Sequence, residues 1–173
     1  RCVMAKQMKD EAGKFVKHVM EGHLYYPSLN SPNTKFKPEG IYETFLVPID
    51  KSEIAEAKAF EGNGPKIKEW ENNGIPEAIH FKQYTRRKDG TDNPKPPVRD
   101  AEGNPFNFTK DGRDIKIGNG TRAKIQYYIY EIKNAYGQFT SYMISAVKIL
   151  DLVEFEPEAQ QDPTEISEEN LDF

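Results

Sequence analysis

Residues 121–132 read TRAKIQYYIYEI and carry the clearest strand pattern in the chain. Side chains in a β-strand point alternately to opposite faces, so residues two apart share a face. One face of this segment is apolar and is expected to lie in a core: Ala123, Ile125, Tyr127 and Ile129. The other face combines cations with aromatic rings and is expected to meet solvent or a ligand: Arg122, Lys124, Gln126, Tyr128 and Tyr130.

Four more strands are predicted around this segment. Residues 139–153 follow it after a turn near 134–137, which indicates an antiparallel hairpin. Upstream segments rich in β-branched and aromatic residues predict the other three strands: 14–26, 41–49 and 79–88. The sequence PSLNSPNTKFKPEG, between the first two of these, is rich in turn-forming residues and predicts a long loop.

Helical signals are confined to the region between the second and third upstream strands. An Ala-rich run over 51–60 predicts a helix, with Asp50 or Ser52 as its N-cap and a glycine closing it. Pro65 suits the first turn of a second short helix that would run to Trp70.

The stretch 89–120 is rich in Gly, Pro, Asp and Asn, and it predicts irregular structure with a small hairpin around Gly103. Five strands and a helical insertion in one small, mostly β domain predict a five-stranded OB-fold barrel.

Length and composition fit one soluble domain with a polar surface. The chain has 173 residues, of which 36% are hydrophobic and 30% charged, enough for one core. No apolar run is long enough for a membrane helix, residues 1–20 lack the apolar core of a signal peptide, and Cys2 is the only cysteine. These features favour a reducing, cytoplasmic compartment.

Neither a metal site nor a catalytic site is expected. His18, His23 and His80 lack the spacing of a metal motif, and no cofactor-binding motif is present. The carboxylates of the body are scattered, whereas a two-metal nuclease needs them clustered. The sequence therefore predicts a binding protein that is not an enzyme and needs no cofactor.

The charge distribution is strongly asymmetric. Residues 154–173 hold eight of the 28 acidic residues and no Lys or Arg, so residues 1–153 carry 24 basic against 20 acidic residues. Such a segment cannot bury enough apolar surface to fold alone and is expected to be disordered. We therefore predict an OB-fold domain over 1–153 that binds a polyanion, followed by an acidic tail.

Two strand faces carry the combination that single-strand binding requires, namely cations for phosphates and rings that stack on bases. On 79–88, Ile79 and Phe81 are expected to point inward. His80 is expected to point outward, on the same face as the basic and aromatic residues of this strand. The DNA-binding candidates on the two strands are Lys82, Tyr84, Arg86, Lys88, Arg122, Lys124, Tyr128 and Tyr130. An ordinary solvated face with amphipathic tyrosines would show the same pattern on either strand alone.

Further candidates lie in the predicted loops. Lys35, Phe36 and Lys37 form a cation–aromatic cluster in the loop where OB-folds often grip a ligand. Tyr136 and Tyr142 flank the last turn and could extend the stacking surface. For 41–49 the alternation does not decide which face is inward.

The order of several motifs resembles the single-stranded DNA-binding proteins of short-tailed, lytic DNA phages. The motifs are GIYETFLVPI (40–49), VRDAEGNPF (98–106), IGNGTRAKIQYYIY (117–130), AVKILDLVEF (146–155) and a final Asp-Phe. The resemblance implies an OB-fold, binding of single strands without sequence preference, and a role in DNA replication and recombination. It also implies a homodimer.

The same resemblance implies that the tail competes with DNA and recruits replication proteins such as a polymerase and a primase–helicase. The tail positions that match are Glu168, Glu169, Asp172 and Phe173. Leu171 and Phe173 are large apolar side chains at the end of an acidic segment, which by itself indicates an anchor for a partner's pocket. Three other interpretations remain open on the residues alone. They are a DNA-processing enzyme such as a small nuclease or resolvase, an RNA-binding OB module, and an interaction protein without a nucleic-acid role.

Overall fold

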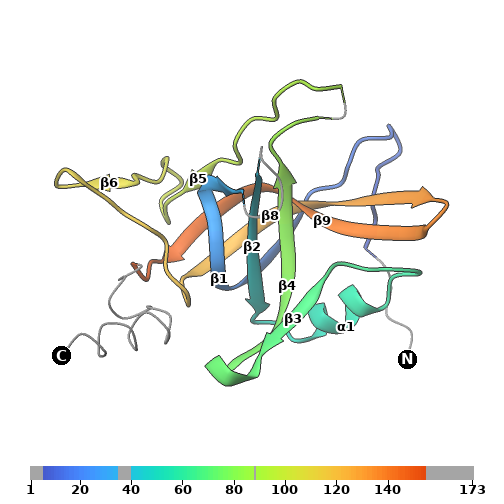
Figure 1. Cartoon of the computed structure of the whole chain (residues 1–173), viewed down its shortest axis with the longest axis horizontal. Helices are drawn as coiled ribbons and strands as arrows, with labels where there is room; N and C mark the ends of the chain where they lie inside the picture. Colours follow the sequence, from blue (N-terminus) through green and yellow to red (C-terminus); the bar gives the residue numbers. More distant parts are fainter. Residues whose placement is uncertain (1–5, 35–39, 88, 155–173) are drawn as a thin grey trace, which may run out of the picture.

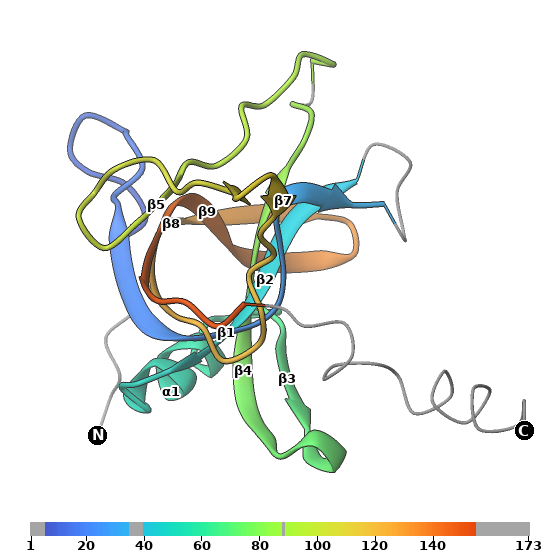
Figure 2. The same ribbon diagram turned by 90° about the vertical axis from the view of Figure 1, so that its left-hand side faces the viewer.

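The computed structural model describes residues 6–34, 40–87 and 89–154. Five strands form a closed barrel: β1 (His18–Asn33), β2 (Ile41–Pro48), β4 (Ile75–Tyr84), β8 (Arg122–Asn134) and β9 (Gly137–Asp151). Antiparallel pairing links β4 to β2, β2 to β1, β1 to β8 and β8 to β9. A short parallel pairing between β4 and β9 closes the ring, which Figure 2 shows nearly end-on. The predicted five-stranded OB-fold barrel is confirmed.

Three aromatic side chains fill the core where the barrel closes. Phe81 of β4 is in register with Tyr142 of β9, and their ring centroids lie 5.5 Å apart. The ring of Tyr127 from β8 lies 4.7 Å from Tyr142 and 5.2 Å from Phe81. All three side chains are fully buried. Aromatic pairs at these separations add to the free energy of burial, so this cluster stabilises the closure of the barrel.

The alternation predicted for the strands is confirmed where it was clearest. Ala123, Ile125, Tyr127 and Ile129 of β8 are completely buried, as are the inward residues of β4. On β2 the structure settles the face that the sequence left open, because Thr44 and Leu46 point into the barrel.

Gly22 of β1 permits the close crossing of β1 and β2. A Cβ atom at this position would overlap the carbonyl oxygen of Val47 and lie 2.9 Å from the Leu46 side chain.

Smaller elements decorate the barrel. The helix α1 turns Ile54 and Ala57 into the main core. In Figure 1 the β8–β9 hairpin projects from one side of the barrel and the β6–β7 hairpin from the other. The bounds of these elements are α1 (Ser52–Lys58), β3 (Ile67–Trp70), the 3-10 helix η1 (Glu71–Asn73), β5 (Val98–Arg99), β6 (Thr109–Lys110) and β7 (Arg113–Asp114).

The second predicted helix is wrong. Residues 67–70 form the strand β3, in which Lys68 is in register with Ala78 of β4. Pairing with a barrel strand therefore overrides the local helix signal of Pro65. The first helix is shorter than predicted and has Lys51 at its N-cap position without a side-chain bond. Asp50 instead accepts hydrogen bonds from the backbone N–H and the hydroxyl of Ser52.

Several strand boundaries also differ from the prediction. β1 starts at His18 and continues to Asn33 through much of the predicted loop, with two irregularities in its pairing to β2. The strand predicted over 79–88 is β4, which begins nearer the N-terminus and ends at Tyr84. Around Gly103 there is a turn with one bridge, from Arg99 to Pro105, while the paired hairpin of this region is β6–β7.

The N-terminal segment docks on the barrel through a half-buried lysine. Lys6 Nζ donates to the hydroxyl of Tyr127 at 2.7 Å and lies 2.8 Å from Glu53 and 3.8 Å from Glu56 of α1. Burial raises the pKa of Tyr127, and the two carboxylates act in the same direction, so Tyr127 stays neutral. The ammonium group therefore joins the N-terminal segment, the helix and the barrel core.

Substitutions at Tyr142 test the aromatic closure. Its hydroxyl is buried without a hydrogen-bond partner within the described part of the chain. We expect Tyr142→Phe to leave the free energy of unfolding unchanged or slightly raised, because it removes a polar atom that gains nothing from burial. Tyr142→Ala should lower it by about 3–5 kcal/mol through the cavity it leaves. Urea unfolding of the two variants measures the difference, and equal losses would contradict the packing described.

Candidate nucleic-acid interface

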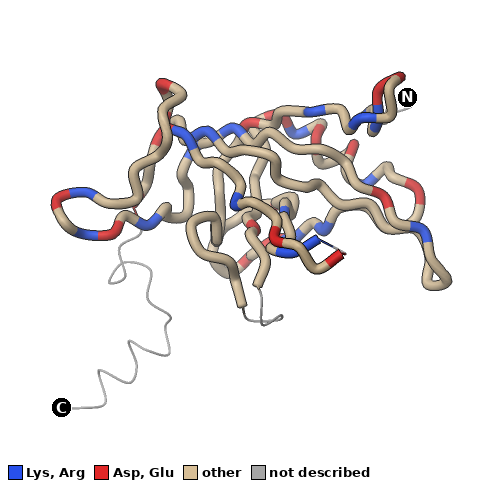
Figure 3. The backbone as a smooth tube through the Cα atoms, turned by 90° about the horizontal axis from the view of Figure 1, so that it is seen from above, with Lys and Arg blue, Asp and Glu red and all other residues tan. Residues whose placement is uncertain are grey.

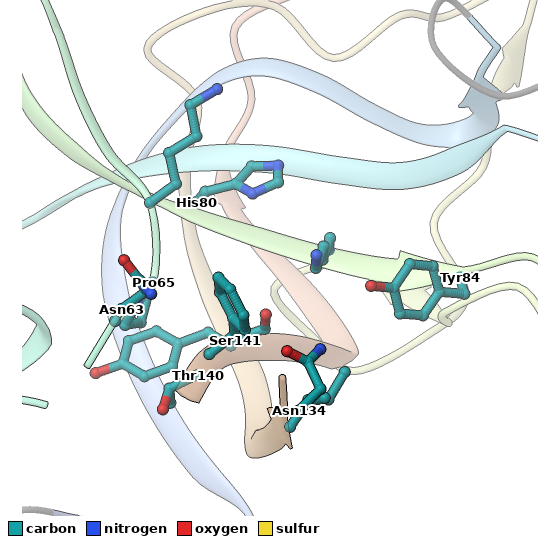
Figure 4. A pocket seen from close by; sticks show the side chains of 13 residues that line it. Asn63, Pro65, His80, Tyr84, Asn134, Thr140 and Ser141 are labelled. Carbon is teal, nitrogen blue, oxygen red and sulfur yellow. The ribbon is translucent and has the colours of Figure 1, made fainter. Parts of the chain in front are cut away.

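A groove of about 430 Å³ lies between the outer face of β4 and the projecting β8–β9 hairpin. In Figure 4, His80 and Tyr84 lie on the β4 side, and Asn134, Thr140 and Ser141 on the hairpin side. Asn63 and Pro65 close one end of the groove. The third barrel strand and the loop between the last two strands are surfaces that OB-folds use for oligonucleotides.

The β4 wall presents the chemistry predicted for it. His80, Lys82 and Tyr84 alternate with inward residues and line the groove together. Lys82 Nζ lies 5.1 Å from the centre of the Tyr84 ring, a cation–π contact that holds the charge beside the ring. The predicted outward face of this strand is therefore confirmed for these three residues.

The opposite wall comes from one face of the β8–β9 hairpin. Ile132 pairs with Phe139, and Tyr130 pairs with Ser141, so these four side chains share a face. Ile132, Phe139 and Ser141 line the groove, and Phe139 is 37% exposed. The hairpin carries Phe139 past the barrel and leaves its ring open to solvent.

Tyr128 and Tyr130 continue this face toward the barrel, but the N-terminal segment partly covers them. The ring of Phe15 lies 4.8 Å from Tyr128 and 6.1 Å from Tyr130, and Lys17 Nζ lies 4.7 Å from the centre of the Tyr128 ring. Gln83 of β4 donates to the Tyr128 hydroxyl at 3.2 Å. Both tyrosines are half-buried, so they point outward as predicted but are less accessible than an open stacking face requires.

A hydrogen bond between strands borders the groove. His80 Nε2 lies 2.7 Å from a carboxylate oxygen of Glu43 on β2, and Asn33 donates to the second oxygen at 2.7 Å. The hydrogen bond from His80 is the largest of the influences that lower the pKa of Glu43, and burial acts against it. The carboxylate is therefore held ionised beside the imidazole, and the His80 ring is fixed at the edge of the groove.

Two predicted residues lie on a different wall of the barrel. Arg122 lies 3.1 Å from Glu21, and Lys124 is exposed beside Lys148 of β9. Lys148 is also in register with Arg99 of β5, so three strands place cations side by side. Figure 3 shows basic positions close together along the upper edge of the barrel. This basic row, defined as Arg99, Lys124 and Lys148, is separate from the groove.

The remaining predicted residues fall into three groups. Tyr142 borders the groove but its side chain is fully buried, so its assignment as a stacking residue is wrong. Tyr136 is 89% exposed at the tip of the hairpin, and Arg86 lies beyond the end of β4, 3.8 Å from Asp92. The others lie outside the described residues: Lys35, Phe36, Lys37, Lys88, Glu168, Glu169, Leu171, Asp172 and Phe173.

Within residues 6–34, 40–87 and 89–154 no group of three or more His, Cys, Asp or Glu side chains could hold a metal ion. The same part of the chain contains no helix long and apolar enough to cross a membrane.

Comparison with known proteins finds the match in three dimensions only. No family model and no curated protein sequence matches the chain. The crystal structure of gp2.5, a single-stranded DNA-binding protein encoded by bacteriophage T7, superimposes with a TM-score of 0.57. That match covers 84% of this chain and 97% of gp2.5 at 15% sequence identity. The single-stranded DNA-binding protein from bacteriophage Enc34 gives a TM-score of 0.53 at 18% identity, over 94% and 97% of the two chains.

At this level of identity the likeness shows the fold. The chain has the OB-fold of these two phage single-stranded DNA-binding proteins across almost their whole length. The fold that the motif resemblance implied is therefore confirmed, with a groove on the barrel surface that OB-folds use for oligonucleotides.

The change in the stability of the protein at low pH should depend on Glu43. Its pKa in the folded state lies below the ordinary value of 4.5, so the contribution of the pair is complete above that pH and is lost as pH falls through the lowered pKa. We expect the difference in unfolding free energy between the parent and Glu43→Gln to be larger at pH 6 than at pH 3. Denaturant unfolding at both pH values measures it, and a difference independent of pH would contradict the ionised pair.

Proposed function

We propose that this protein binds single-stranded DNA without sequence preference and is not an enzyme. The observation that carries the proposal is the groove, in which Lys82, Tyr84 and Phe139 stand on facing walls. Aromatic rings accept any base, and cations accept the phosphate backbone, so the arrangement needs no specific sequence. The excess of basic residues over 1–153 and the likeness to two phage single-stranded DNA-binding proteins support the same conclusion.

We infer further that the protein acts in phage DNA replication and recombination in the host cytoplasm, as a homodimer. The support is the resemblance of its motifs, together with the names of the two structural neighbours. The acidic tail 154–173 is proposed to compete with DNA for the basic surface and to recruit a polymerase and a primase–helicase. Its candidates for partner contact remain Glu168, Glu169, Leu171, Asp172 and Phe173.

Substitutions in the groove should separate stacking from charge. Lys82→Ala should weaken binding of oligo-dT and lower the slope of log K against log salt by about 0.7, the value for one phosphate on a single strand. Tyr84→Ala should weaken binding by about 1–3 kcal/mol with little change in slope, because a stacking contact is lost. Fluorescence anisotropy of a labelled oligonucleotide at several salt concentrations measures both effects.

Lys110→Ala is the matched control, since Lys110 is exposed on the β6–β7 hairpin away from the groove. Duplex DNA of the same length should compete poorly, because its stacked bases cannot reach the rings of the groove. Competition with an RNA oligonucleotide of the same length distinguishes the RNA-binding alternative. Equal affinity for duplex would exclude base stacking as the basis of binding, and preference for RNA would favour the alternative module.

Removal of residues 155–173 should tighten binding of single strands. These residues hold seven carboxylates and no Lys or Arg, so a tethered polyanion is lost from the neighbourhood of a basic surface. Because the competition is electrostatic, the gain should be largest at low salt and should vanish at high salt. Deletion of Phe173 alone keeps every side-chain charge, so it should leave DNA affinity unchanged and reduce capture of replication proteins. A truncated chain that binds no more tightly at low salt would contradict the competition.

A further inference from the structure

A chain of aromatic rings leaves the groove at His80 and continues across the outer face of the barrel. The ring of His80 lies 4.8 Å from Phe45 of β2, Phe45 lies 4.9 Å from Trp70 of β3, and Trp70 lies 4.9 Å from Tyr26 of β1. The four rings, here called the aromatic track, come from four neighbouring strands. Since His80 also lines the groove, the track and the groove form one continuous surface.

Cations lie along the track as they do in the groove. Lys66 Nζ is 5.9 Å from the centre of the Phe45 ring, and Lys68 Nζ is 5.0 Å from that of Trp70. Both lysines are exposed, and Lys66 also lines the groove. Lys68 and Trp70 are two apart on β3, and their cation–π contact places them on the same side of the strand. Positive charge thus accompanies the rings on the side where a phosphate backbone would run.

The four rings of the track are only partly buried. Beneath them, Val47, Ile75 and Ala78 form a small buried cluster against which Phe45 and Trp70 pack. Tyr26 at the far end is 42% exposed. Beside Trp70 there is a hollow of about 350 Å³ lined by Glu69, Trp70, Glu71, Asn72 and Asn73. The carboxylates at this hollow disfavour a phosphate, so the hollow suits a base edge with the phosphates on the lysine side.

Tyr26 is held in a backbone conformation that tyrosine rarely adopts. Its φ is +52°, in the left-handed region, where a bulky side chain is strained. Two hydrogen bonds maintain it: the backbone N–H donates to the Asn119 side chain at 2.7 Å, and Asn73 donates to the Tyr26 hydroxyl at 3.1 Å. Strain of this kind persists where the surroundings fix it and gathers at ligand-binding sites. Here it turns an exposed ring toward Trp70.

We propose that the aromatic track is a second stacking subsite, which takes the bases of a single strand that continues out of the groove. The proposal rests on the proposed function and extends it, because it gives the strand a direction across β4, β2, β3 and β1. It predicts that the length of the oligonucleotide decides whether the track is occupied. Short oligonucleotides fill the groove, and longer ones reach Trp70.

Trp70 is the only tryptophan in the chain, so tryptophan emission, excited where tyrosine does not absorb, comes from the track alone. The experiment titrates the full-length protein with end-labelled oligo-dT of increasing length, following label anisotropy for binding and tryptophan emission for stacking. We expect every oligonucleotide that binds to raise the anisotropy, and only the longer ones to quench Trp70. Quenching that is absent at every length, despite a full anisotropy change, would overturn the track and leave the groove in place. Absence of any anisotropy change would overturn the proposed function and the track with it.

Two variants test whether quenching reflects contact. Lys68→Gln removes one charge and keeps the side-chain stem, and Tyr26→Asn removes the ring at a position where Asn tolerates the left-handed backbone. Each should lower the affinity for long oligonucleotides by about 5-fold or more, and leave that for the shortest binding oligonucleotide unchanged. Lys110→Ala is again the control and should change neither. Equal losses at all lengths, or none, would contradict a separate subsite.

Discussion

The parallel contact between β4 and β9 is the constraint on which the rest of the structure depends. Only two register pairs make it, at Phe81–Tyr142 and Lys82–Met143, yet it turns an open sheet into a barrel. The buried rings of Phe81, Tyr127 and Tyr142 supply the free energy that so few hydrogen bonds could not. The same two strands also carry the walls of the groove. Closure of the barrel therefore also forms the groove.

This coupling explains why polar, charged and aromatic side chains are concentrated on the outer face of β4. Inward residues of β4 must be large and apolar to close the barrel, so the side chains that line the groove stand at the positions between them, His80, Lys82 and Tyr84. The β8–β9 hairpin is built in the same way, with its inner residues in the core and its extension forming the second wall. Along such a strand, apolar core residues alternate with residues that face the groove. This two-residue alternation is visible in the sequence.

That signal is why much of the fold could be predicted. Alternation placed Ile79, Phe81, Ala123 and Ile125 inward because a two-residue period needs no knowledge of the neighbouring strand. The same period would have placed Tyr142 in the core, since Thr140 and Ile144 on its face are also buried. It was assigned to the surface because it lies near the turn in the sequence. The hairpin projects beyond the barrel, so the turn lies outside the barrel while Tyr142 lies inside it.

The residues that the sequence did not reveal depend on contacts between distant segments. Trp70 was predicted in a helix, because nothing local shows that β3 pairs with β4 and packs on Phe45. Phe15 reaches Tyr128 across more than a hundred residues, and no pattern in the N-terminal segment indicates this. Tyr26 could not be identified from the sequence either, since its left-handed backbone is held by a hydrogen bond to Asn119, which lies far along the chain. Such positions can be found only when the strands are assembled.

The basic row has a consequence for how the molecule responds to its medium. Arg99, Lys148 and Lys124 stand in register on adjacent strands, where like charges repel at a separation of about 5 Å. Added salt screens this repulsion and so relieves the barrel wall, while the same ions compete with phosphates for the cations of the groove. Ionic strength that relieves this repulsion in the barrel wall would therefore weaken the proposed complex with DNA.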